Sequence, residues 1–357
     1  MPKAGETLWD IAVEEVLHKE NLETKEDEQK LDVWERTVFF VGSKAGGKTT
    51  LILRFLDRDE APKPTLALEY TFGRRAKGHN TPKDIAHLWE LGGGTSLTEL
   101  ITIPINVSSI RTLSLVLVLD LSKPHDLWMT MEKLLQADRI QVNKVLTELG
   151  KTDSAGANEL KRQIWKTVSK DHPDHELIDP FPIPLVIIGN KYDIFQDFDS
   201  EQRKVICKTL RCVAHYYGAS LVFTSYKAEA LVLKMRNLIN HLAFGTERNK
   251  AVSVDYNKPL YIPAGLDSFN QIGSLSDTDI GKLRTQKLTE VWKIMFERVF
   301  PAKSTSGMKD IKDPAKDPQY AEPEVDAMRA QKDQELEQYK RNALKSWKGI
   351  QLDSRGT

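Results

Sequence analysis

A glycine-rich segment between a strand pattern and a helix pattern constrains this chain more than any other feature. The apolar run TVFFVG leads into GSKAGGKT, residues 42–49, and a helical pattern follows. Glycines there let backbone N–H groups turn inward around phosphate oxygens, and the helix directs its positive end at them. Gly42, Gly47, Lys48 and Thr49 match the motif that places a lysine on the β- and γ-phosphates and a hydroxyl on Mg²⁺. The pattern therefore predicts a nucleotide phosphate site rather than a glycine-rich turn without a ligand.

Beyond this loop, short apolar runs alternate with helical periods. The runs LVLVL (115–119) and LVIIG (185–189) are apolar without alternation, as expected for strands that are covered on both faces. Strands that alternate with helices imply βαβ units, right-handed connections and a parallel sheet. We therefore predict an α/β P-loop domain over residues 36–250, with a mostly parallel sheet flanked by helices.

Three later segments stand where a guanine-nucleotide domain would need them. Asn190-Lys191-Tyr192-Asp193 follows an apolar run and resembles N-K-x-D, in which the aspartate accepts two N–H donors that guanine offers and adenine lacks. Residues 224–227, TSYK, resemble the T-S-A-K loop that supports the same base. Residues 90–93, ELGG, resemble D-x-x-G, whose acid assists Mg²⁺. The order of these motifs is that of Ras-like domains, and each follows a predicted strand, where parallel sheets bind ligands.

This Ras-like interpretation gives two sets of candidate residues. The candidate nucleotide-binding residues are Gly42, Gly47, Lys48, Thr49, Thr50, Asn190, Lys191, Asp193, Ser225 and Lys227. The candidate Mg²⁺ residues are Thr49, Thr65 and Glu90.

Two departures argue against hydrolysis. Glu90 replaces the usual aspartate, and Gly94 stands where Ras-like enzymes carry the glutamine that orients the attacking water. We therefore expect no catalytic residue and a chain that is not an enzyme. Two alternatives remain open, an active small GTPase switch and an ATP-using P-loop enzyme, and the guanine-selecting Asn190 and Asp193 argue against the second.

Three regions flank the domain. Residues 1–35 form an expected amphipathic helix and linker, and residues 251–300 an expected strand and helix that pack on the domain. The apolar stripe of that later helix is Leu288, Val291, Trp292, Met295 and Val299. Residues 301–357 form an expected linker and partner-docking helix, since Tyr and Trp are typical interface anchors. The stripe of this last helix is Val325, Met328, Leu336, Tyr339, Ala343, Trp347 and Ile350.

Composition and charge exclude several classes of function. The chain has 51 basic and 51 acidic residues, so its zero net charge gives no electrostatic reason to bind nucleic acid. No apolar run approaches the roughly 20 residues of a membrane helix, so we expect no membrane insertion. Cys207 and Cys212 are expected to be buried small apolar groups. The cluster at residues 171–175, DHPDH, lacks the ligand set of a zinc pattern and is expected to be a polar loop.

Several long and unusual segments together resemble one family. They are GSKAGGKTT, PKPTLALEYTFGRR, AHLWELGGG, LVLVLDLSKP and DHPDHELIDPFPIPLVIIGNKYDIF. From about Leu8 to Trp347 the chain resembles the light intermediate chains of cytoplasmic dynein, and it is most similar to the branch of cytoplasmic dynein 2.

The resemblance implies a non-catalytic accessory subunit. Such a subunit binds and stabilises the heavy-chain tail, joins other dynein 2 subunits, and reaches microtubules only indirectly. It serves retrograde intraflagellar transport and cilium assembly, which implies the cytoplasm, the cilium with its axoneme, and the basal body or centrosome. The nucleotide site would then be a structural or regulatory pocket that holds guanine nucleotide with Mg²⁺ or is empty.

Overall fold

The computed structural model describes residues 35–76, 83–166, 171–247, 251–273, 288–302 and 322–353. The chain divides into two units, Met1–Lys303 and Ser304–Thr357. The helix predicted before residue 35 and most of the linker predicted after residue 301 lie outside the described residues. Within those described ranges, no helix combines the length and the apolar character that a bilayer crossing requires.

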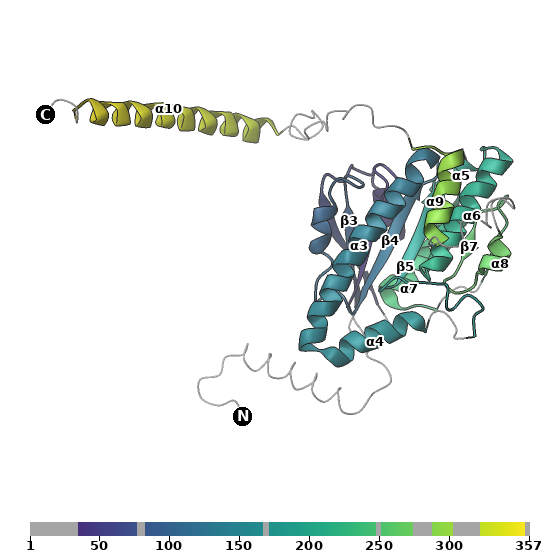
Figure 1. The fold of residues 1–357 in the computed structure, drawn as a ribbon. Helices are drawn as coiled ribbons and strands as arrows, with labels where there is room; N and C mark the ends of the chain where they lie inside the picture. Colours follow the sequence, from purple (N-terminus) through teal and green to yellow (C-terminus); the bar gives the residue numbers. More distant parts are fainter. Residues whose placement is uncertain are drawn as a thin grey trace. The chain divides into compact units, whose positions relative to one another are not determined.

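A seven-stranded sheet forms the centre of the described part of the first unit (Figure 1). Its strands are β1 (Glu35–Gly42), β2 (Leu68–Arg75), β3 (Asp84–Leu91), β4 (Leu113–Asp120), β5 (Leu185–Asn190), β6 (Ser220–Phe223) and β7 (Tyr261–Ile262). They are ordered β2-β3-β1-β4-β5-β6-β7, and only the edge strands β2 and β7 run antiparallel to their neighbours. The predicted α/β, Ras-like fold with a mostly parallel sheet is confirmed.

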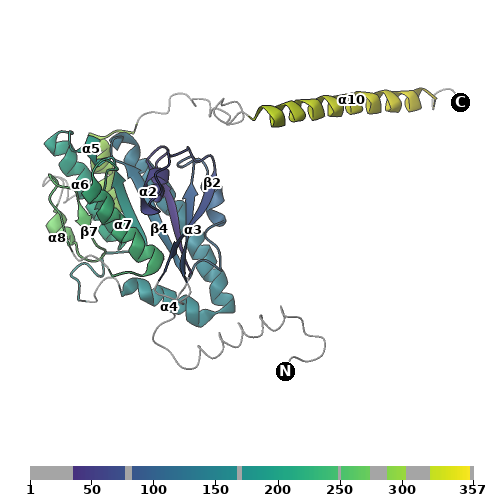
Figure 2. The ribbon, with the colours of Figure 1, turned by 180° about the vertical axis from the view of Figure 1, so that it is seen from behind.

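Helices cover both faces of this sheet. In chain order they are α2 (Lys48–Phe55), α3 (Pro124–Thr152), α4 (Ser154–Trp165), α5 (Tyr192–Phe195), α6 (Ser200–Tyr216), α7 (Glu229–Phe244), α8 (Phe269–Ile272) and α9 (Leu288–Val299), with a 3₁₀ turn at Thr98–Thr102. Helices α3, α6 and α9 cover one face, and α2 and α7 cover the other (Figures 1 and 2). The second unit contributes α10 (Pro323–Asp353).

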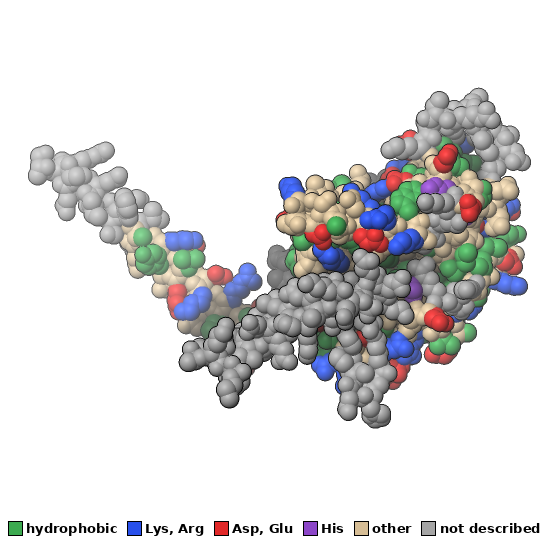
Figure 3. Space-filling model, turned by 90° about the horizontal axis from the view of Figure 1, so that it is seen from below, with side chains coloured by type: hydrophobic (Ala, Val, Ile, Leu, Met, Phe, Trp, Pro, Cys, Tyr) green, Lys and Arg blue, Asp and Glu red, His purple; other side chains and the backbone are tan. Residues whose placement is uncertain are grey.

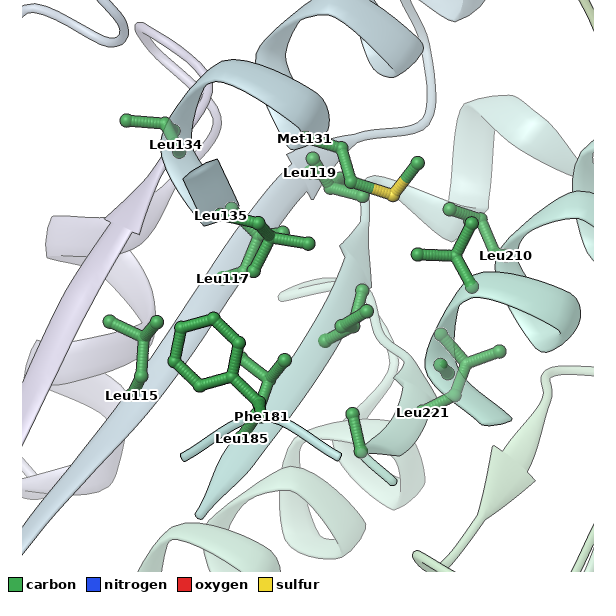
Figure 4. Close-up of a cluster of buried hydrophobic side chains, with 14 of the residues drawn as sticks. Leu115, Leu117, Leu119, Met131, Leu134, Leu135, Phe181, Leu185, Leu210 and Leu221 are labelled. Carbon is green, nitrogen blue, oxygen red and sulfur yellow. The ribbon is translucent and has the colours of Figure 1, made fainter. Parts of the chain in front are cut away.

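The central strand β4 shows why the sheet is buried on both sides. Leu115, Leu117 and Leu119 belong to the apolar cluster that contains residues of α3 and α6, while Val116 and Val118 belong to the cluster with α2 and α7. Figure 4 shows the leucines of β4 beside side chains of α3 and α6. An unbroken apolar run is the sequence that such a strand requires.

Helix α9 packs on the rest of the first unit with most of the predicted stripe, and only the end of the stripe differs. Trp292, Met295 and Phe296 are buried, whereas Val299 of the predicted stripe is 44% exposed. The helix ends at Val299, and the next residue, Phe300, is buried where the prediction placed Val299. The Trp128 ring of α3 lies 6.1 Å from the Phe296 ring, so α9 closes over the α3 face of the sheet.

Candidate nucleotide-binding site

The predicted phosphate loop connects the carboxyl end of β1 to the first turn of α2. Gly47 directly precedes α2 in a left-handed conformation, with φ of 89°. A Cβ atom at this position would lie 2.4 Å from Nδ2 of Asn190, so only glycine fits. The same amide of Asn190 donates to the backbone oxygen of Gly46 over 2.8 Å. Asn190, which was predicted to belong to the base-reading motif, therefore fixes the conformation of the phosphate loop.

Lys48 begins α2, and its side chain folds back onto the loop. Its residue is only 4% exposed, and Nζ donates to the backbone oxygen of Ser43 over 3.1 Å. Burial lowers the pKa of Lys48, and the nearby charge of Glu90 partly opposes this shift. Thr50 lies half-buried on the same first turn of α2. A cation held at a helix N-terminus beside inward-facing amides suits a phosphate group.

The three candidate Mg²⁺ residues lie together although they are far apart in sequence. Thr49 Oγ1 donates to Glu90 Oε1 over 2.9 Å and lies 3.5 Å from Thr65 Oγ1. Thr65 Oγ1 donates to Glu69 Oε2 over 3.1 Å. Thr49 is the donor in its hydrogen bond with Glu90, so the lone pairs of its oxygen remain available. Mg²⁺ prefers oxygen ligands of this kind. Glu90, one methylene longer than the usual aspartate, thus lies within hydrogen-bond distance of the Thr49 hydroxyl.

Glu90 supplies the negative charge of this set from inside the protein. It lies at the end of the parallel pairing between β3 and β1 and is 5% exposed. Burial raises the pKa of Glu90, while Lys48 and the hydrogen bond from Thr49 lower it. A bound divalent cation would favour the ionised carboxylate further.

The position that usually orients the attacking water cannot carry a long side chain in this conformation. Gly94 has φ of 65°, in the left-handed region. A Cβ atom there would lie 3.1 Å from the backbone nitrogen of Lys44 and 3.3 Å from its Cβ. Both the residue type and the left-handed backbone at this position therefore disfavour a side chain that could orient a water.

The base-reading residues also converge, and Asp193 is held by both members of the second motif. Ser225 Oγ donates to Asp193 Oδ1 over 2.7 Å, and Lys227 Nζ lies 2.7 Å from Oδ2. Burial alone would raise the pKa of Asp193, but these hydrogen bonds hold it below its usual value. The carboxylate is therefore held in place at both oxygens, by Ser225 and by Lys227, where the predicted guanine contact would form.

Lys191 pairs with Asp120, a residue of the site that the sequence did not indicate. It has φ of 63° and its Nζ lies 2.6 Å from Oδ2 of Asp120, which is buried at the end of β4. The backbone nitrogen of Asp120 donates to Ser43 Oγ over 3.2 Å. Asp120 thus contacts the phosphate loop and the base motif at once. The only signal in the sequence was a charge that ends the apolar run LVLVLD.

The DHPDH segment is a polar loop, as predicted, but it meets an unforeseen partner from α6. Potential ligand atoms of His172, Asp174 and His215 lie within 4.8 Å of one another. Hydrogen bonds already use them. His172 Nδ1 accepts from the backbone nitrogen of Asp174 over 3.2 Å, and His215 Nε2 lies 2.9 Å from Asp174 Oδ2. Both cysteines are buried, as predicted.

Comparison with known proteins assigns the family. The family model of the dynein light intermediate chain matches residues 3–170 and 171–287. The human cytoplasmic dynein 2 light intermediate chain 1 is 66% identical over 352 residues, which cover 98% of this chain and 99% of that protein. The chain belongs to the dynein light intermediate chain family. The zebrafish (Danio rerio) cytoplasmic dynein 2 light intermediate chain 1 is 59% identical over 99% of this chain and 100% of that protein.

The other branch of the dynein light intermediate chain family is far less similar. The human cytoplasmic dynein 1 light intermediate chain 1 is 22% identical over 76% of this chain and 56% of that protein. A solved structure of the conserved domain of a dynein light intermediate chain has a TM-score of 0.51 and 16% identity, covering 67% of this chain and 84% of that one. This likeness supports the fold. The resemblance that the sequence motifs indicated is confirmed.

Proposed function

We propose that this chain is a non-catalytic accessory subunit of the cytoplasmic dynein 2 motor complex. In this role it binds and stabilises the heavy-chain tail, serves retrograde intraflagellar transport and cilium assembly, and reaches microtubules only through the heavy chain. Its location would be the cytoplasm, the cilium with its axoneme, and the basal body or centrosome. The support is the 66% identity to a dynein 2 light intermediate chain over nearly the full length of both chains.

We further propose that the pocket binds guanine nucleotide with Mg²⁺ as a structural or regulatory ligand and does not turn it over. Lys48 and the loop amides would hold the phosphates, Thr49 and Thr65 would face the ion, and Asp193 would accept from the base. Mg²⁺, when bound, would neutralise phosphate charge. The observation that carries the proposal is the left-handed Gly94 against Lys44, which leaves no side chain to orient a water.

The accessory role is tested by recovery of the complex. The full chain is isolated from ciliated cells with its partners, which are identified by mass spectrometry. We expect the dynein 2 heavy chain, and its absence would contradict the proposal. A Lys48→Ala variant serves as the matched comparison, because equal recovery of the heavy chain would mean that the nucleotide does not regulate heavy-chain binding.

The nucleotide is identified by denaturing the purified chain and separating the released ligand by chromatography. We expect guanine nucleotide without turnover. Adenine nucleotide would contradict the role of Asp193, and an empty pocket would leave the accessory role without nucleotide regulation. GTP hydrolysis that Lys48→Ala abolishes would instead support the alternative, an active small GTPase switch.

A further inference from the structure

Helix α10 exposes apolar side chains over the part of it whose side chains the structure describes. Val325, Met328, Leu336 and Tyr339 are 58%, 64%, 49% and 71% exposed. Figure 3 shows hydrophobic side chains on this helix among charged side chains of both signs. A long helix with such a stripe is stable mainly when another surface covers the stripe.

The spacing of the stripe is regular and symmetric. Counted from Val325 to Ile350, the seven apolar residues of the stripe and Lys332 occupy eight positions at intervals of 3, 4, 4, 3, 4, 4 and 3 residues. The pattern repeats every 11 residues, at 3.67 residues per turn, so the stripe runs nearly parallel to the helix axis. The intervals also read the same from either end. A stripe of this kind superposes on itself when a second copy of the helix lies antiparallel.

The charges along α10 also favour an antiparallel pair. Residues 323–337 contain five acidic and two basic side chains, and residues 338–353 contain four basic and one acidic. A parallel pair would place acidic half against acidic half, whereas an antiparallel pair places each half against its opposite. The helix dipole favours this polarity within one helix, but it does not account for the exposed apolar stripe.

We propose that α10 packs antiparallel against α10 of a second copy of this chain, with the two-fold axis between Glu337 and Gln338. In this register Leu336 of one copy lies opposite Tyr339 of the other, and Lys332 lies opposite Ala343. The small alanine leaves room for the lysine stem while its charge reaches water. This interface goes beyond the proposed function and does not depend on the nucleotide pocket.

Thiol crosslinking on the full chain tests the register. Lys332→Cys and Ala343→Cys chains are prepared separately and mixed, and a short thiol crosslinker is added. The native Cys207 and Cys212 should not react with the crosslinker, because both are buried and burial raises the pKa of Cys207 to about 12. We expect crosslinked dimer from the mixture. Lys332→Cys alone should give none above background, because the two copies of residue 332 are about 16 Å apart along the axis.

Two results would overturn the register. Stronger crosslinking of Lys332→Cys with itself than with Ala343→Cys would mean a parallel pair. Crosslinking of α10 to the dynein heavy chain alone, in the recovered complex, would mean that a different protein covers the stripe.

Sedimentation of the full chain tests the interface independently. Leu336→Glu places a charge at the centre of the stripe, and we expect it to abolish dimerisation. Gln338→Glu makes the same charge change on the opposite side of the helix and is the matched control, expected to retain the dimer. Helix content measured by circular dichroism shows whether either variant has lost α10. A wild-type chain that remains monomeric at every concentration would overturn the proposal, as would a dimer that Leu336→Glu leaves intact.

Discussion

Helices α3 and α10 have nearly the same length but opposite surroundings. α3 has 29 residues and buries twelve of them, while α10 has 31 residues and every described side chain from Glu322 to Asn342 is exposed. Packing against the sheet stabilises α3, whereas α10 has local ion pairs such as Lys332 with Glu335, 2.7 Å apart. Helices of similar length can therefore form part of a core or present a contact surface, depending on what covers the apolar face.

The largest effect on stability should come from a buried ion pair in the first unit, Met1–Lys303, which is called the packed unit below. Arg211 of α6 donates to Asp267 through Nε and a terminal nitrogen over 2.9 and 2.7 Å, and both side chains are buried. Asp267→Ala leaves the guanidinium without its partner, so we expect a loss of about 3–5 kcal/mol in the free energy of unfolding. Urea denaturation measures it.

Replacing both partners is the control for this prediction. A chain with Arg211→Met and Asp267→Leu removes the charges together, and it should recover most of the loss. If Asp267→Ala costs less than about 1 kcal/mol, the pair contributes little to holding residues 251–273 on α6.

A pair of identical substitutions tests the comparison of the two helices directly. Leu134 of α3 is fully buried, and Leu134→Ala should cost about 2–5 kcal/mol in unfolding free energy. Leu336→Ala on α10 should change the unfolding of the packed unit by less than about 0.5 kcal/mol. Both are measured by urea denaturation. Equal losses would mean that α10 shares the core after all.

A third contrast concerns two glycines of the packed unit. Gly94→Ala forces a side chain onto a left-handed residue against Lys44, so we expect a loss of about 1–3 kcal/mol. Gly150 lies within α3, where a new Cβ would only reach van der Waals distance, 3.9 Å from the Ala157 Cβ. Gly150→Ala should therefore stabilise the chain by about 0.4–1 kcal/mol. Thermal unfolding of both variants gives the signs, and destabilisation by both would refute the conformational argument.

The smallest effect is a dependence of stability on pH. Burial lowers the pKa of His215 against the opposing hydrogen bond with Asp174. The unfolded chain therefore takes up a proton near its ordinary pKa of about 6.5 before the folded chain does. Stability should fall as the pH drops below that value, by at most about 1.4 kcal/mol per pH unit.

Two measurements check this assignment. His215→Gln should flatten the dependence of urea stability between pH 7 and the folded pKa. The helix content of α10, which contains no histidine, should not follow the same profile. An unchanged slope in the variant would mean that another group titrates.

The sequence predicted those parts of the fold that depend on short-range patterns. The glycine spacing located the phosphate loop, and unbroken apolar runs located β4 and β5. Strand β2 was missed because it is an edge strand whose residues Tyr70 and Phe72 are exposed, so its pattern has no buried face to mark it. Helix α4 was also missed, and it buries only Ala157.

Side-chain pairings across the sheet could not be predicted in the same way. The sequence named Asp193, Ser225 and Lys227 separately, but their geometry depends on how closely the ends of β5 and β6 approach. The convergence of Thr49, Thr65 and Glu90 followed from motif order, because each motif has a known place at the sheet edge. No motif indicated Asp120, whose partners lie 77 residues before it and 71 after it.

Asp120 links the two halves of the candidate site, because its backbone nitrogen donates to Ser43 and its carboxylate pairs with Lys191. A phosphate group that shifts Ser43 would disturb the support of Lys191, and a base that moves Lys191 would release the strand end behind Ser43. A change at either residue would therefore reach the other through a single amino acid of β4.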